Sequence, residues 1–200
     1  MNENNSTDSV AAMGARLAAE VSSFISAKCP QLTHPESSDF ISFIGHSIGG
    51  LIIRAALLEA PLQPFKERLH TYVSLSTPHL GTMFAQSQLV STGMWALLKL
   101  KKSTILEQLR LEDGNDVTNS YLYHLSMTSS LQGFTHVVFV SAHEDGYVPS
   151  HSARGVDPEV AGANGVALLS MASNLLSGLA NPSVLLRMDV EGSFQHTTVD

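Results

Sequence analysis

The order of apolar and polar positions along the chain predicts alternating helices and strands. Apolar residues recur near the helical period over residues 11–28, and later runs are short and rich in β-branched and aromatic residues. We expect helices over 11–28, 49–58, 89–100, 105–111, 121–131 and 166–179, and strands over 40–45, 69–76, 135–142 and 183–190. Strands of this kind, separated by helices, are typical of a parallel sheet with helices on both faces.

Composition narrows the class of protein. The 200 residues suit one domain, and 44% apolar with 14% charged residues is typical of a globular chain. The net charge of −7 and the scattered acids argue against a nucleic-acid partner, which needs a concentrated basic face. The single cysteine, Cys29, excludes an internal disulfide. Met1 to Ser9 does not read as a secretory signal, and Val166 to Leu179 is too short and polar to span a bilayer, so we expect an intracellular, cytoplasmic protein.

A serine between two glycines stands where a predicted strand meets a predicted helix. In the pentapeptide Gly45-His46-Ser47-Ile48-Gly49, the two glycines allow the sharp turn that exposes a nucleophilic hydroxyl. The first N–H groups of the following helix, that of Ile48 above all, favour a developing oxyanion. The pattern therefore predicts Ser47 as a nucleophile. The alternative is a glycine-rich turn that carries an ordinary exposed serine.

Two motifs together carry a family resemblance. Residues 43–51 (Phe-Ile-Gly-His-Ser-Ile-Gly-Gly-Leu) and 75–82 (Leu-Ser-Thr-Pro-His-Leu-Gly-Thr) resemble the lipase-like putative serine esterase family of the α/β-hydrolase superfamily. Within it, the chain looks closest to the C-terminal domain of large intracellular animal proteins, and residues 144–149 and 152–154 also look like that group. The resemblance implies hydrolysis of carboxylic esters, lipid esters included, through an acyl-serine, with no cofactor and no metal.

The order of a hydrolase triad is Ser, then Asp or Glu, then His. Asp145 follows the predicted strand 135–142 and would orient the histidine. Glu144 is its neighbour and competitor, and the resemblance favours Asp145 because it directly precedes Tyr-Val-Pro. The alternative is a turn aspartate that binds its own backbone.

Only His196 follows the last predicted strand, so it is the candidate base. The resembling family has its histidine deeper in a longer loop before a closing helix, so an ordinary surface histidine is the equal alternative. We expect His46 to pack under the turn and His79 to lie near the mouth of the site. His143 and His151 flank Asp145 without the spacing of a metal site.

The fold normally has strands before the nucleophile strand and an early His-Gly loop that gives a second oxyanion donor. Here 39 residues precede Phe40, and no His-Gly pair occurs before Gly45. We therefore expect a disordered tail over residues 1–10 and, over 11–200, an α/β-hydrolase domain that is truncated on its N-terminal side and near its C-terminus. The alternative function is a catalytically silent hydrolase fold that serves as an interaction module.

The segment Leu89 to Leu100 carries Trp95 and several leucines, and Lys99, Lys101 and Lys102 lie at its end. It is either a helix with core residues on one face or a lid that touches lipid. A peripheral membrane contact is therefore one alternative, and the sequence does not name a protein partner.

Overall fold

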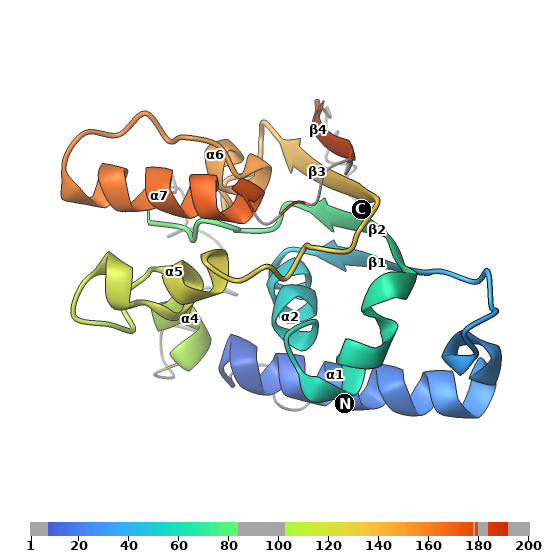
Figure 1. The fold of residues 1–200 in the computed structure, drawn as a ribbon. Helices are drawn as coiled ribbons and strands as arrows, with labels where there is room; N and C mark the ends of the chain where they lie inside the picture. Colours follow the sequence, from blue (N-terminus) through green and yellow to red (C-terminus); the bar gives the residue numbers. More distant parts are fainter. Residues whose placement is uncertain (1–7, 84–102, 178, 180–183, 192–200) are drawn as a thin grey trace, which may run out of the picture.

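Four strands form one sheet in the computed structural model, which describes residues 8–83, 103–177, 179 and 184–191 (Figure 1). All neighbouring strands are parallel, and their order in the sheet is their order along the chain. Each predicted strand is confirmed to within one residue at either end. The strands are β1 (Ile41–His46), β2 (Leu69–Leu75), β3 (His136–Ala142) and β4 (Val184–Val190).

The helices confirm most of the predicted pattern. They are α1 (Val10–Lys28), η1 (Pro30–Thr33), α2 (Ile48–Ala56), η2 (Ala60–Arg68), α4 (Thr104–Leu109), η4 (Val117–Asn119), α5 (Tyr121–Ser126), α6 (Ser150–Arg154) and α7 (Ala163–Ser177). The helix predicted over 121–131 is five residues too long, because α5 ends at Ser126. Sequence patterns missed η2 and α6, since prolines begin or interrupt the first and α6 has only five residues. The predicted helix over 89–100 lies outside the described residues.

Helix α1 is positioned by its cap and by a close approach to α2. The Ser9 hydroxyl accepts a hydrogen bond from the N–H of Ala12 at 3.2 Å, which satisfies one free donor of the first turn. A Cβ atom at Gly14 would lie 2.6 Å from the Cβ of Ala55, so the two helices pack at backbone distance. Helix α1 therefore packs against α2, the helix that follows Ser47.

One face of the sheet carries the core. The strands are parallel and in sequential order, and crossovers of the usual right hand place the connecting helices of such a sheet on the same face. On that face Tyr72 and Phe139 are fully buried, and their rings meet edge to face at 6.5 Å. The Tyr72 hydroxyl donates a hydrogen bond to the carbonyl of Gly50 in α2 at 3.0 Å. The sheet and the nucleophile helix are thus fixed to each other by a buried contact.

The opposite face is exposed in the described part of the chain. Ile44 of β1 is 71% exposed, and Leu186 and Met188 of β4 are 49% and 51% exposed. These two β4 residues lie in register with Val138 and Val140 of β3, so an apolar surface crosses several strands. The prediction of helices on both faces of the sheet is therefore confirmed for one face. Among the described residues, no helix covers the second face.

Candidate active site

Ser47 lies at the sharp turn between β1 and α2. Its backbone angles are φ 52° and ψ −128°, a combination that a residue with a side chain rarely adopts. Strain of this kind costs on the order of 1–3 kcal/mol and persists where the surroundings hold it. The Ser47 N–H donates to the carbonyl of Leu75 in β2 at 2.8 Å, which anchors the turn to the neighbouring strand. The strand, turn and helix expected around Ser47 are all present.

Two glycines make this turn sterically possible, and one of them is not the predicted one. A Cβ at Gly45 would lie 2.6 Å from the backbone nitrogen of Gly50, so β1 and α2 approach there at backbone distance. A Cβ at Gly50 would lie 2.2 Å from the Thr77 hydroxyl oxygen. Nothing lies within 4 Å of the corresponding position at Gly49. The sequence interpretation is correct for Gly45 and wrong for Gly49, because Gly50 makes the close contact instead.

Ile48 is the first residue of α2, directly after Ser47. Its N–H belongs to the first turn, whose donors have no acceptor within the helix, and the helix dipole adds positive potential there. This geometry suits the oxyanion role predicted for the Ile48 N–H.

Asp145 lies in the turn that follows β3. One of its carboxylate oxygens accepts hydrogen bonds from the N–H groups of Tyr147 at 2.9 Å and Val148 at 3.0 Å. The Asp145 N–H donates to the carbonyl of Ala142 at 3.2 Å. The side chain is half-buried, whereas its competitor Glu144 is exposed. Asp145 therefore shapes its own turn, as the alternative interpretation expects, and that turn also gives the carboxylate a fixed position.

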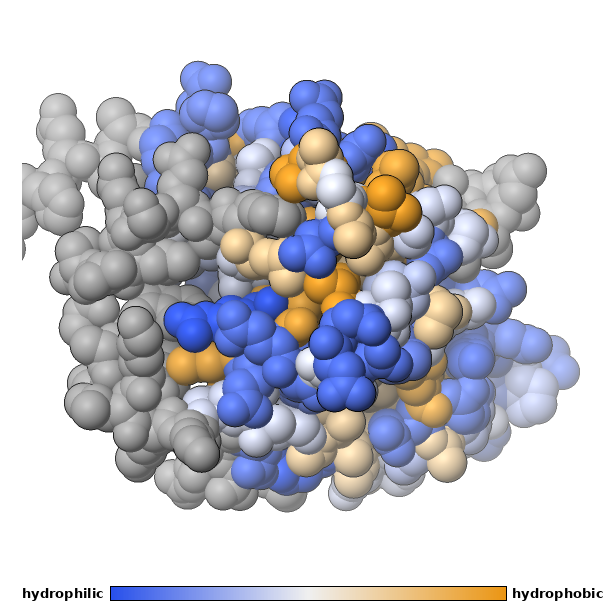
Figure 2. Space-filling view, turned by 90° about the vertical axis from the view of Figure 1, so that its left-hand side faces the viewer, coloured by the Kyte–Doolittle hydropathy of each residue, from blue (hydrophilic) through white to orange (hydrophobic). Residues whose placement is uncertain are grey.

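Both candidate groups lie at the same edge of the sheet. The carboxyl ends of parallel strands meet at one edge, and ligands of open α/β sheets bind there. Strand β2 separates β1 from β3, so the ends that carry Ser47 and Asp145 are two strand spacings, or about 10 Å, apart. The strands in Figure 1 point toward this edge, and Figure 2 shows the molecule from that side, with hydrophobic and hydrophilic surface interspersed. A side chain between the two groups is needed to connect them.

His196, the predicted base, lies outside the described residues. Strand β4, which precedes it, is the neighbour of β3, so the chain leaves the sheet at the same edge, next to the turn of Asp145.

Two other histidines, His46 and His79, have different surroundings from those expected. His46 is exposed, so the prediction that it packs under the turn is wrong. The reason is strand alternation: Gly45 faces α2, and the next residue faces away. His79 is fully buried rather than at the mouth of the site. His143 is exposed, and burial lowers the pKa of His151. Among the described residues, no three His, Cys, Asp or Glu side chains gather as a metal site would require.

A buried arginine explains the position of His79. Arg54 of α2 is fully buried, and its guanidinium donates to the carbonyl of Leu125 at 3.0 Å and to the hydroxyl of Ser130 at 3.3 Å. It also lies 3.4 Å from Nδ1 of His79. Because the guanidinium has only donors, Nδ1 is the acceptor, and Nε2 carries the proton toward the Ser74 hydroxyl at 3.0 Å.

Electrostatics fit this assignment. Burial lowers the pKa of Arg54 to about 10, so it stays charged at neutral pH. Burial, and then the charge of Arg54, hold the pKa of His79 well below its ordinary value. His79 is thus neutral with both nitrogens engaged, and it is unsuited to act as the base. The sequence signal for this network was an arginine inside the apolar run Leu-Ile-Ile-Arg-Ala-Ala-Leu, residues 51–57.

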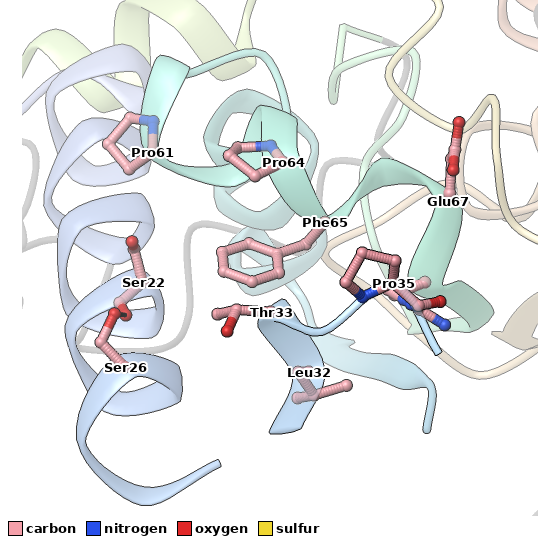
Figure 3. Close-up of a pocket in the computed structure, with 10 residues that line it drawn as sticks. Ser22, Ser26, Leu32, Thr33, Pro35, Pro61, Pro64, Phe65 and Glu67 are labelled. Carbon is pink, nitrogen blue, oxygen red and sulfur yellow. Dashed lines mark hydrogen bonds between the residues drawn. The ribbon is translucent and has the colours of Figure 1, made fainter. Parts of the chain in front are cut away.

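A pocket of about 470 Å³ lies elsewhere (Figure 3). It lies between α1, η1 and η2 and is partly open to solvent, and Phe65, Pro61 and Pro64 line it. Arg68, which directly precedes the first residue of β2, also lines the pocket. The pocket therefore lies toward the amino ends of the strands, and none of the predicted site residues lines it.

Comparison with known protein families gives a match over most of the chain. The family described as putative serine esterase (DUF676) matches residues 1–158. The chain belongs to this family. The matched part includes Ser47, Ile48 and Asp145, and it ends before α7, β4 and position 196. This confirms the family resemblance and the α/β-hydrolase fold predicted from the sequence, while the likeness to the C-terminal domain of large animal proteins stays a prediction.

No solved structure matches the chain. Among the described residues, none of the helices combines the length and the apolar character needed to cross a membrane.

Proposed function

We propose that the protein is a serine esterase that hydrolyses carboxylic esters through an acyl-serine intermediate on Ser47. The observation that carries the proposal is the strained, glycine-dependent turn at Ser47, followed directly by the N-terminus of α2. Membership of the putative serine esterase family supports an esterase-like activity on a small-molecule ester. The roles of the individual residues are part of the proposal.

The proposed reaction proceeds in two steps. Ser47 Oγ attacks the ester carbonyl carbon while its proton passes to the imidazole of His196. The oxyanion that forms accepts a hydrogen bond from the Ile48 N–H. The protonated imidazole then gives that proton to the departing alcohol, which leaves the acyl group on Ser47. Water attacks the acyl-serine by the same route and releases the acid. Asp145 holds the imidazole in the required tautomer and stabilises its charged form.

We further propose that the substrate is a lipid ester. The segment Leu89 to Leu100, with Trp95 and the neighbouring lysines, would make contact with the lipid phase, as an apolar helix face beside cations does. We also propose that the reaction needs no cofactor and takes place inside the cell.

A second candidate is a catalytically silent hydrolase fold that acts as an interaction module. One observation favours it: Asp145 accepts two hydrogen bonds from its own turn, which is a structural role complete in itself. The two candidates predict opposite outcomes for the chemical reactivity of Ser47.

The deciding experiment is labelling of the folded chain with a fluorophosphonate probe, with mass spectrometry to locate the adduct. We expect a single adduct on Ser47 that is absent in Ser47→Ala. Ser76→Ala is the matched control, because Ser76 also follows a strand and has positive φ (46°), but the described residues directly after it, 77–83, form an irregular loop rather than a helix. A folded wild-type chain that takes up no probe would contradict the esterase proposal and favour the silent module.

A further inference from the structure

The loop after β2 connects the two parts of the proposed site. This loop, residues 76–82, begins at the end of the strand that separates Ser47 from Asp145. Thr77, His79 and Leu80 are buried, although the segment has no regular secondary structure. The backbone N–H and C=O groups of a buried loop need hydrogen-bond partners within the protein, so these partners indicate which elements the loop connects.

On one side, the loop is bound to the nucleophile helix. Arg54 of α2 donates toward His79 Nδ1, and Thr77 packs against Gly50, about one helical turn closer to Ser47. Tyr72 adds its hydroxyl contact to the Gly50 carbonyl from the strand that leads into the loop. A shift of α2 relative to this loop would break all of these contacts together.

On the other side, one serine of α6 binds the loop twice. The Ser152 hydroxyl accepts the N–H of Leu80 at 3.0 Å and donates to the carbonyl of Gly81 at 2.6 Å. Ser152 is fully buried, and these two bonds use both the proton and a lone pair of its hydroxyl. Helix α6 is short, so such long-range bonds matter more to its position than its own helical bonds.

Helix α6 is continuous with the turn of Asp145. The Asp145 carboxylate accepts a hydrogen bond from the N–H of Val148, which is buried. Pro149 follows and directly precedes the first residue of α6. The segment 145–154 is therefore tied at one end by the Asp145 turn and near the other by Ser152.

We infer that Ser152 is a positioning residue, the last member of a buried brace formed by Arg54, His79 and Ser152 that sets the Asp145 turn relative to Ser47. This inference rests on the proposed esterase function, since it assigns Ser152 an effect on the acid of that site. The brace acts through Asp145 and touches neither the substrate nor the reacting atoms.

The test measures the second-order rate constant for fluorophosphonate labelling of Ser47 in Ser152→Ala. We expect labelling to slow about tenfold. Ser126→Ala is the matched control, because Ser126 is also fully buried and its hydroxyl donates only within its own helical turn, to Tyr123 at 2.6 Å; its rate should stay within about twofold of wild type. Faster amide exchange at Leu80 in Ser152→Ala would verify that the brace is broken.

A double-mutant cycle separates positioning from general loosening of the structure. In an Asp145→Asn background, Ser152→Ala should slow labelling no further, because the group that it positions is already gone. An equal slowing in both backgrounds, or a Ser152→Ala rate equal to that of Ser126→Ala, would overturn the brace and leave the esterase proposal intact. No labelling of the folded wild type would overturn both. If Ser152→Ala does not fold, Ser152→Cys carries the same comparison with a weaker hydrogen-bonding group.

Discussion

The turn at Ser47 and the turn at Asp145 lie at the same edge of the sheet, but they are built differently. Ser47 is held in a strained backbone conformation with the help of distant residues: its N–H donates to the carbonyl of Leu75, and Thr77 packs against Gly50 in the first turn of the following helix. Asp145 is held by its own side chain, which accepts N–H groups two and three residues ahead. The first turn therefore depends on tertiary packing, and the second can form from local sequence alone. Substitutions should affect the two turns in different ways.

The largest expected effect is on reactivity rather than stability, in Asp145→Asn. An asparagine keeps a carbonyl oxygen for the N–H groups of Tyr147 and Val148, so the turn should persist and stability should change by less than about 1 kcal/mol. Loss of the carboxylate charge should slow Ser47 labelling by about 10³–10⁴-fold, as expected for a triad acid. Glu144→Gln, at the exposed neighbour, is the control and should label as wild type. If the two variants exchange these results, Glu144 is the acid.

Arg54→Ala tests the dependence of the Ser47 side on packing. The substitution leaves a cavity beneath α2 and removes the donor for Leu125, Ser130 and His79, so we expect a loss of about 3–5 kcal/mol in the free energy of unfolding, measured with urea. Arg110→Ala is the control, since Arg110 is half-exposed with an ion pair to Glu112 at 4.0 Å, and it should cost less than about 1 kcal/mol. Equal losses would show that the buried network contributes little.

The adjacent glycines at the start of α2 give a sharper test. Gly50→Ala would place a methyl group 2.2 Å from the Thr77 hydroxyl, and Thr77 is fully buried, so we expect destabilisation by about 1–3 kcal/mol. Gly49→Ala meets nothing within 4 Å and should stabilise the protein by about 0.5–1 kcal/mol, because alanine favours the helix. Thermal unfolding of the two variants gives the comparison, and a destabilising Gly49→Ala would contradict it.

Sequence reasoning succeeded where the signal was local. The four strands, the strand–turn–helix around Ser47 and the hydrogen-bonding turn of Asp145 all follow from residues close together in the chain. The short apolar runs between polar breaks were identified as strands by their length and their β-branched and aromatic residues, since periodicity alone does not distinguish such runs from buried helix segments. The family resemblance rested on the same local motifs.

The same reasoning failed where the partner is distant. The burial of His79 depends on Arg54, 25 residues earlier, and the need for glycine at position 50 depends on Thr77. The pentapeptide pattern assigned the steric role to Gly49, because it contains no information about what packs beside the helix. Likewise, residues 152–154 carried part of the family resemblance, but no sequence pattern assigned a role to Ser152, because its two hydrogen bonds are made to the distant loop after β2.

The last expected effect concerns the loop between the two turns, through the titration of His79. Its pKa is low in the folded protein because of burial and the charge of Arg54, whereas in the unfolded chain it is ordinary, about 6.5. Below about pH 6.5 the unfolded state therefore binds more protons, and His79 should reduce stability as the pH falls, with a slope approaching about 1.4 kcal/mol per pH unit. Above that pH it should contribute no slope.

His79→Gln isolates this contribution, because the amide can accept from Arg54 and donate to Ser74 without titrating. Urea unfolding of both proteins at about pH 5 and about pH 7 should show a smaller pH dependence in the variant. Acidic groups elsewhere titrate equally in the two proteins and cancel in the difference. Identical pH profiles would mean that His79 takes up a proton as easily in the folded state as in the unfolded one. That outcome would contradict the neutral imidazole with both nitrogens hydrogen-bonded, on which the connection between the two turns depends.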